Sequence, residues 1–346
     1  MKYRKLGRTG LDISLIGLGT MTWGFQNTQD DGFEQMDYAL ENGINFFDTA
    51  EMYAVPPSAD TFGKTEAIIG NWFAARNNRD KVILASKITG PGLPWVRDGN
   101  NRIDKKNIHL ALDSSLERLQ TDYIDLYQLH WPNRGSYHFG QSWGYAPDFD
   151  PQAEQDNFLE VLHTMQSLID AGKIRHIGLS NETAWGMTKW LQLAEQYNLP
   201  RMASIQNEYS LLCRYFEPDL SEIALHEDCG LLAWSPLSRG TLSGKYLNGA
   251  RPEGSRLTIE TRPDHRDHPQ AEAATHKYVN LAKQHGLDPC KMALAFVNTR
   301  PFVSSTLIGA TNMQQLKTNI DSINLNLSHE LIDEIEKIRR DHPMPY

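Results

Sequence analysis

Short apolar runs alternate with longer amphipathic segments along the whole chain, and this alternation restricts the possible folds more than any other feature. The runs are rich in Ile, Leu and Val, and several are continuously apolar, which is typical of parallel strands buried on both faces. We identify eight of them: Ile13–Gly19, Ile44–Asp48, Val82–Lys87, Ile124–His130, Ile174–Ser180, Ala203–Asn207, Leu231–Ser235 and Ser305–Gly309.

The segments between the runs have helical periodicity. In one of them the Ile and Leu side chains from Ile108 to Leu119 share one helix face, and Asp104 is a suitable N-cap for that helix. Similar patterns predict helices around residues 161–169, 220–224 and 313–320, and another from residue 292 with Pro289 in its first turn.

Eight strand–helix units in succession predict an α/β fold of the (β/α)8 TIM-barrel type. An open dinucleotide-binding sheet would instead need a Gly-x-Gly-x-x-Gly turn after its first strand, and the segment Gly17–Thr22 lacks the third glycine. The stretch Arg4–Ser14, with Gly7 and Gly10 between apolar positions, predicts an N-terminal β-hairpin that closes the barrel floor. Because no composition break interrupts the pattern, we expect one barrel domain over residues 1–346.

Composition excludes several classes of function. The formal net charge of −9 disfavours nucleic acid as the main partner, since phosphate backbones are bound by clustered Lys and Arg. The three cysteines are widely spaced and predict neither a disulfide framework nor a zinc ribbon. No apolar run has the roughly 18 residues of a membrane helix, and the basic N-terminus lacks the apolar core of a signal peptide. We expect a cytoplasmic protein, a monomer or weak homo-oligomer, whose partner is a small molecule.

Four polar residues lie at or just beyond the ends of consecutive predicted strands: Asp48, Tyr53, Lys87 and His130. The carboxyl ends of barrel strands meet at one mouth, where catalysis takes place in such folds. A tyrosine with an ordinary pKa near 10 is a poor acid at neutral pH, and a neighbouring ammonium lowers that pKa. Lys87 can supply the ammonium, Asp48 can hold the lysine, and His130 can orient a substrate oxygen. The set therefore predicts carbonyl reduction with Tyr53 as proton donor.

Two segments are longer than a minimal connection and follow the fourth and seventh strands, namely Trp131–Asp156 and Asn248–Asp267. Loops of such length are usually functional in a compact domain. Aromatic residues could line an apolar substrate pocket at the mouth, with ordinary loop packing as the alternative reading. The residues predicted for this pocket are Trp23, Tyr53, Trp95, His130 and Trp131, and Trp143 is a further aromatic at the same mouth.

Several motifs, in order along the chain, resemble those of the aldo-keto reductase superfamily: Gly17–Met21, Asp48–Tyr53, Leu126–Pro132, Lys173–Asn181 and Trp234–Leu237. The resemblance covers essentially the whole chain. The closest similarity is to the bacterial Tas-like branch, which is related to the potassium-channel β-subunits. The spacing from Asp48 to Tyr53, the Pro56-Pro57 pair and the long loop after His130 indicate that branch.

The resemblance implies that Asp48, Tyr53, Lys87 and His130 form a catalytic tetrad, and it also implies contacts with a cofactor. Ser180, Asn181 and Gln206 match positions that hold the nicotinamide carboxamide, and Trp234 matches an aromatic that stacks on the nicotinamide ring. The remaining implied cofactor residues are Thr20, Met21 and Asp48 near the ribose and nicotinamide, Ser235, Pro236, Leu237, Gly240 and Lys245 around the pyrophosphate, Arg256 at the 2′-phosphate, and Gly309, Thr311, Gln315 and Asn319 around the phosphate and adenine.

The residues themselves favour NADPH over NADH as the cofactor. Gly309 precedes a predicted helix whose N-terminus favours phosphate, and Lys245 and Arg256 add positive charge to an acidic chain. The Lys-Ser pair that many superfamily members place at the adenosine phosphate is replaced here by Gly309-Ala310-Thr311. We therefore expect NADP(H)-dependent reduction of aldehydes or ketones to alcohols.

Two other functions have to be distinguished from this one. The channel-related relatives suggest a cofactor-binding regulatory subunit with little turnover as the alternative. A metal-dependent hydrolase on the same barrel is disfavoured, because the strand ends lack a His-x-His motif or clustered carboxylates, and we expect no metal.

Overall fold

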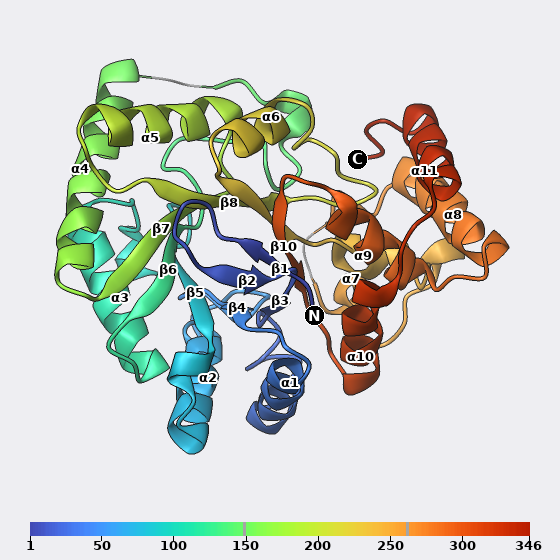
Figure 1. The fold of residues 1–346 in the computed structure, drawn as a ribbon, viewed down its shortest axis with the longest axis horizontal. Coiled ribbons are helices and arrows are strands. Elements are labelled where there is room, and N and C mark those ends of the chain that lie inside the picture. Colours follow the sequence, from blue (N-terminus) through green and yellow to red (C-terminus); the bar gives the residue numbers. More distant parts are fainter. Residues whose placement is uncertain (148–149, 261–262) are drawn as a thin grey trace.

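The eight apolar runs form the eight parallel strands of a closed barrel, which confirms the predicted TIM-barrel architecture (Figure 1). The computed structural model describes residues 1–147, 150–260 and 263–346. Neighbouring strands pair in chain order, and the last closes on the first. Their bounds are β3 Ile16–Gly19, β4 Phe46–Asp48, β5 Ile83–Ile88, β6 Ile124–Leu129, β7 Ile174–Ser180, β8 Met202–Glu208, β9 Gly230–Trp234 and β10 Val303–Ile308.

Helices surround the barrel and connect its strands. The predicted N-cap is present, because the Asp104 side chain accepts a hydrogen bond from the Asn107 N–H at 2.8 Å. Pro289 is likewise in the first turn of its helix, as expected. The helices are α1 Gln29–Glu41, α2 Lys64–Arg76, α3 Lys105–Leu119, α4 Pro151–Asp170, α5 Ala184–Gln196, α6 Asp219–His226, α7 Arg256–Ile259, α8 Pro269–Gln284, α9 Pro289–Thr299, α10 Met313–Asp321 and α11 His329–Asp341.

An N-terminal hairpin closes one end of the barrel, as predicted. Its strands are β1, Tyr3–Lys5, and β2, Asp12–Ser14, so the run predicted as one strand from Ile13 is divided between the hairpin and β3. Leu6 and Ile13 are fully buried against side chains inside the barrel. Gly7 has a φ of 52°, and a Cβ there would lie 2.4 Å from the Ala203 carbonyl oxygen, so only glycine allows the hairpin to approach this closely.

The core has two parts, which explains why the strands are apolar on both faces. The larger part fills the space between strands and helices. The smaller part lies inside the barrel and includes Phe46, Leu126 and Leu232. The interior is crowded, because a Cβ on Gly17 would lie 2.8 Å from a methyl group of Leu307.

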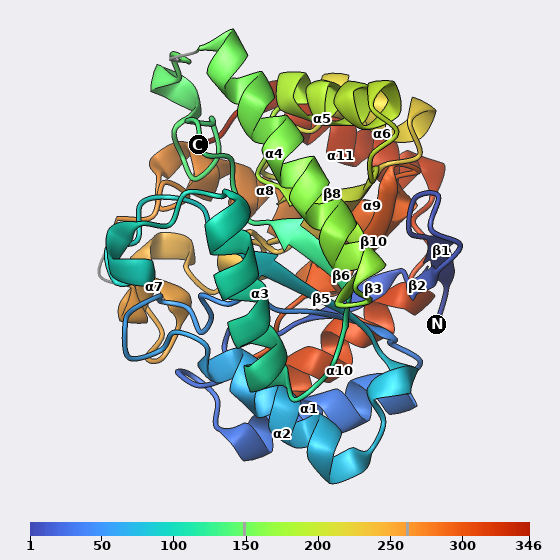
Figure 2. The ribbon, with the colours of Figure 1, turned by 90° about the vertical axis from the view of Figure 1, so that its left-hand side faces the viewer.

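The other end of the barrel carries the long loops. Figure 2 shows α7, part of the predicted loop 248–267, at the end opposite the hairpin. The predicted loop 131–156 is shorter than expected, because α4 begins at Pro151. Residues 148, 149, 261 and 262 of these two predicted loops lie outside the described residues.

Candidate active site

Three adjacent strands bring the four predicted catalytic residues to the mouth opposite the hairpin. Asp48 is the last residue of β4, Lys87 lies near the end of β5, and His130 directly follows β6. Strands β4 and β5 are paired, as are β5 and β6. Tyr53 lies in the connection between β4 and α2. The fold thus brings together side chains that are up to 82 residues apart in the chain (130 − 48 = 82).

The ion pair between Lys87 and Asp48 is the most deeply buried part of this cluster. The Lys87 ammonium donates to Asp48 Oδ2 at 2.6 Å and to the Thr49 carbonyl oxygen at 2.7 Å. The Lys87 side chain has no exposed surface. Burial disfavours its charge, but the Asp48 carboxylate and Tyr53 outweigh that effect, so the pKa of Lys87 lies above its usual value. The lysine is therefore a fixed cation at neutral pH.

Tyr53 is half-buried beside this cation, with the Lys87 Nζ 5.0 Å from the centre of its ring. Burial raises the pKa of the Tyr53 hydroxyl, whereas the charge of Lys87 lowers it. Together the two effects raise the pKa of Tyr53. The lowering predicted from the sequence is therefore the contribution of Lys87 alone, and burial outweighs it. The physical reason is that the loss of solvation exceeds the attraction of one cation whose charge is shared with Asp48.

His130 packs its ring edge-on to Tyr53, with the two ring centres 5.8 Å apart. Burial and the nearby Lys87 charge hold the pKa of His130 well below its usual value, so the ring is neutral near pH 7. Its Nδ1 is buried and has no hydrogen-bond partner among the described residues. A neutral imidazole with a free nitrogen can orient a carbonyl oxygen through one N–H.

The three residues predicted to hold a carboxamide lie next to one another at the ends of β7 and β8. Asn181, in a left-handed conformation with φ 52°, donates from Nδ2 to the His130 carbonyl oxygen at 2.9 Å and to Ser180 Oγ at 3.0 Å. Both of its amide hydrogens are thereby used. Asn181 Oδ1 is buried without a partner in the described part of the chain. An unpaired buried acceptor costs about 1–3 kcal/mol, so this atom fits an N–H donor of a bound carboxamide.

The predicted pyrophosphate loop follows β9 directly. Ser235 and Gly240 both have left-handed backbones, with φ of 51° and 94°. A Cβ at Gly240 would lie 2.9 Å from the Nζ of Lys245, so the loop and the lysine are in direct contact. Trp234 is partly exposed at the end of β9, and its indole N–H has no partner among the described residues. Pro236 and Leu237 complete this turn.

Arg256 is buried and forms no ion pair within the described ranges. Its guanidinium donates to the Val55 carbonyl oxygen at 3.2 Å and contacts the Met21 sulfur at 3.5 Å. Burial and repulsion by Arg239 lower the pKa of Arg256 to about 10. Its charge acts on Tyr53, so this cation lies near the tyrosine, where an anionic group would compensate it.

The other predicted cofactor residues form two small groups. Thr20 is buried and donates from Oγ1 to the Asp48 carbonyl oxygen at 2.8 Å. At the start of α10, the Thr311 N–H and hydroxyl both donate to Gln315 Oε1, at 3.0 and 3.1 Å. Asn319 donates to the Gly309 carbonyl oxygen at 3.2 Å.

The predicted aromatic pocket is only partly supported. Trp95 and Trp131 are half-buried at the mouth, and the Trp131 indole donates to the Pro91 carbonyl oxygen at 2.9 Å. Trp143 is 70% exposed. Trp23 is fully buried and donates to Gln35 Oε1 at 3.0 Å. We therefore correct its assignment: Trp23 belongs to the larger core, because its indole packs against α1 at Gly32.

Sequence reasoning missed Phe139, which lies in the loop after β6. Its ring stacks loosely on Trp234, with centres 6.0 Å apart, and meets Trp131 edge-on at 6.2 Å. The only sequence signal for Phe139 is the aromatic content of the long loop, and that content does not determine which aromatic side chain lies at the mouth.

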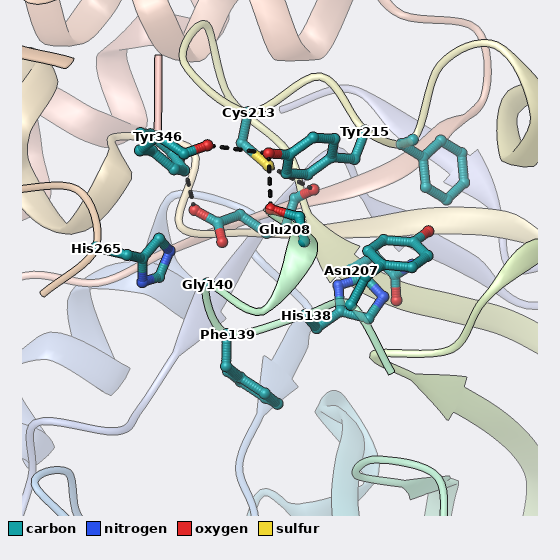
Figure 3. A pocket seen from close by; sticks show the side chains of 12 residues that line it. His138, Phe139, Gly140, Asn207, Glu208, Cys213, Tyr215, His265 and Tyr346 are labelled. Carbon is teal, nitrogen blue, oxygen red and sulfur yellow. Dashed lines mark hydrogen bonds between the residues drawn. The ribbon is translucent and has the colours of Figure 1, made fainter. Parts of the chain in front are cut away.

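A buried ion pair beside Trp234 was also missed. Arg266 binds both carboxylate oxygens of Glu208, at 2.9 and 2.6 Å, and its guanidinium lies 5.9 Å from the Trp234 ring centre. Figure 3 shows the adjoining pocket, in which the Tyr346 hydroxyl donates to Glu208 Oε1 at 3.1 Å. The Tyr215 hydroxyl donates to the Tyr346 carbonyl oxygen at 3.0 Å.

Two kinds of feature are absent from the described residues. No helix in the described ranges has the length and apolar character needed to cross a membrane. Nor do the described His, Cys, Asp and Glu side chains form a group of three or more that could hold a metal ion.

Comparisons with known proteins identify the family of this chain. The family model described as "Aldo/keto reductase family" matches residues 15–340. "Protein tas" of Escherichia coli is 48% identical over 348 aligned positions, which cover 100% of this chain and 99% of that protein. "Uncharacterized oxidoreductase YrpG" of Bacillus subtilis is 33% identical over 98% of this chain and 96% of its own length. "Aldo-keto reductase" of Babesia bovis is 38% identical over 69% of this chain and 88% of its own length. The chain belongs to the aldo/keto reductase family.

Proposed function

We propose that this chain reduces aldehydes or ketones to alcohols with NADPH and that Tyr53 is the general acid. The observation that carries the proposal is the fully buried Lys87–Asp48 pair next to a half-buried tyrosine. A buried ion pair adds little to stability and is costly to maintain. Its position at the mouth, in contact with a group that can exchange a proton, indicates a role in chemistry.

Each residue has a distinct role in this proposal. Tyr53 protonates the carbonyl oxygen, and the fixed charge of Lys87 stabilises the tyrosinate that forms. Asp48 holds the lysine and compensates its charge. His130 is neutral and orients the carbonyl oxygen towards Tyr53. These roles agree with oxidoreduction, which the family and the oxidoreductase-named relatives support.

The residues present fit a reduced nicotinamide cofactor, which when bound would supply a hydride to the carbonyl carbon. Asn181 Oδ1 offers an unpaired acceptor at the mouth. Positive charge for phosphate groups comes from Lys245, in contact with the loop after β9, and from Arg256, which has no ion pair among the described residues. These two cations support NADPH over NADH.

The test is the variant Tyr53→Phe, with reduction of an aldehyde panel followed by NADPH absorbance. We expect kcat to fall by roughly 10²–10⁴, because one positioned proton donor is lost, while the Kd for NADPH changes little. Tyr3→Phe is the matched control, since Tyr3 lies in the floor hairpin and its hydroxyl only donates to the Gly43 carbonyl oxygen. Near-normal kcat in Tyr53→Phe would exclude the proton-donor role. Cofactor binding without turnover of any aldehyde by the unaltered protein would favour a regulatory subunit.

A further inference from the structure

Both oxygens of the Asp48 carboxylate are occupied. Oδ2 accepts from Lys87, and Oδ1 accepts from the side-chain amides of Gln206 at 2.8 Å and Gln128 at 3.2 Å. Gln128 lies in β6, has no exposed surface and is absent from the predicted site. Its own Oε1 accepts a hydrogen bond from Gln206 Nε2 at 3.1 Å. The two glutamines and Asp48 therefore form a closed ring of hydrogen bonds.

This ring determines which way the Gln206 amide faces. Its Nε2 carries two hydrogens, and Asp48 Oδ1 and Gln128 Oε1 accept one each. If the amide were turned over, its oxygen would face two acceptors and no donor. Gln128 cannot turn over to relieve this clash, because its Nε2 must face Asp48. Gln206 Oε1 is thus held as an acceptor, and in the described ranges no side chain or backbone N–H donates to it.

We infer that Gln128 is a positioning residue for cofactor recognition: it fixes the Gln206 amide so that Oε1 accepts an N–H of the nicotinamide carboxamide. The inference rests on the proposed function. Such an acceptor makes the site selective for the carboxamide, because a site that presents acceptors discriminates against a ligand that lacks the matching N–H. Removing the Gln128 acceptor leaves Asp48 Oδ1 alone to hold the Gln206 amide, so the amide is held less firmly and that discrimination becomes weaker.

The test compares the binding of two cofactors by the parent protein and by variants of it. Tryptophan fluorescence titration gives the Kd of NADPH and of its 3-acetylpyridine analogue, in which a methyl group replaces the carboxamide NH₂. The parent protein should bind NADPH about tenfold more tightly than the analogue, as expected for one or two hydrogen bonds. In Gln128→Met, which keeps the side-chain length, this ratio should fall to about one to threefold. Asn298→Leu removes a buried amide on α9 whose side chain accepts from Thr306, and it should keep the parent ratio.

Gln128→Glu provides a rescue. A glutamate oxygen still accepts from Gln206 Nε2, and next to Asp48 the new carboxyl favours its protonated form, whose O–H can replace the second hydrogen bond. The ratio should return to within about threefold of the parent value. A parent-like ratio in Gln128→Met, or a ratio near one in the parent, would overturn the inference while leaving NADPH binding intact. Failure of the parent to bind either cofactor would instead remove the proposed function and the inference together.

Discussion

Replacing Lys87 by Met tests how much the buried cation contributes to catalysis. The Lys87 Nζ lies 5.0 Å from the centre of the Tyr53 ring. At an effective dielectric constant of about 20, opposite charges at that distance attract by about 3 kcal/mol. This corresponds to about two units in the pKa of Tyr53. We expect kcat for reduction to fall roughly a hundredfold, because the tyrosinate formed on proton transfer loses that stabilisation.

The single variant also leaves Asp48 buried without its partner, which costs roughly 3–5 kcal/mol of folding stability. The double variant Lys87→Met, Asp48→Asn removes both charges and should recover most of that loss. Urea denaturation of the two variants separates the effect on stability from the effect on catalysis. In the single variant, the Kd for NADPH measured by tryptophan fluorescence should stay within a few-fold of the parent value, because Asp48 still accepts from Gln206.

Steady-state NADPH oxidation with the best aldehyde of the panel is the assay. The double variant should remain folded at the assay temperature and still show the hundredfold loss in kcat. A well-folded double variant with kcat within about threefold of the parent would refute the electrostatic role of Lys87. A loss of activity that disappears on refolding or at lower temperature would have the same consequence.

Four further outcomes are expected. Because burial raises the pKa of Tyr53, kcat for reduction should be flat from about pH 6 to about pH 8 and fall only at more alkaline pH, and a decline centred near neutrality would contradict this. Arg256→Met should lower the preference for NADPH over NADH about tenfold, measured as a ratio of Kd values, and an unchanged ratio would place the 2′-phosphate elsewhere. Arg266→Met leaves the buried Glu208 carboxylate without its ion-pair partner, so urea denaturation should show that the free energy of unfolding falls by roughly 3–5 kcal/mol. Adding Glu208→Gln to this variant should recover most of that loss. Equal stability of the single and the double variant would argue against a stabilising role of the pair. Burial lowers the pKa of His138 to about 4, below its unfolded value near 6.5, so between these pH values the unfolded chain binds one more proton than the folded protein. The free energy of unfolding should therefore fall by about 3 kcal/mol as the pH drops through that window. His138→Gln should flatten this slope, and a slope that persists in the variant would assign it to other groups.

Much of the fold could be predicted because the signals are local. Runs such as Ile124–His130 are apolar on both faces, and that pattern follows from burial between the barrel interior and the helices. Asp104 and Pro289 are helix-start signals that act within one turn. The break between β2 and β3 could not be predicted, because residues on both sides of it are equally buried and only the hairpin geometry separates them.

The candidate site likewise contains residues that the sequence could predict and residues that it could not. Asp48, Lys87 and His130 could be predicted because a polar residue at the end of an apolar strand stands out in the sequence. Gln128 lies within such a strand, and nothing local indicates that it faces Asp48. Trp23 was misassigned for the related reason that being near the mouth in sequence does not determine the direction of a side chain. The net direction of the Tyr53 pKa depends on the extent of burial, which only the packed structure supplies.

The hydrogen-bonded ring around Asp48 lies on strands β4, β6 and β8, whereas Phe139 and Arg256 lie on connections between strands. The buried ring is therefore held by the barrel strands, whereas the loops supply Phe139 and Arg256 beside it. A library that randomises residues 133–147 of the loop after β6, or exchanges them for those of a relative, would leave Asp48, Tyr53, Lys87 and His130 unaltered. Under the proposed function, this loop is where enzyme engineers would change which carbonyl compounds are accepted while the four residues at the mouth stay in place.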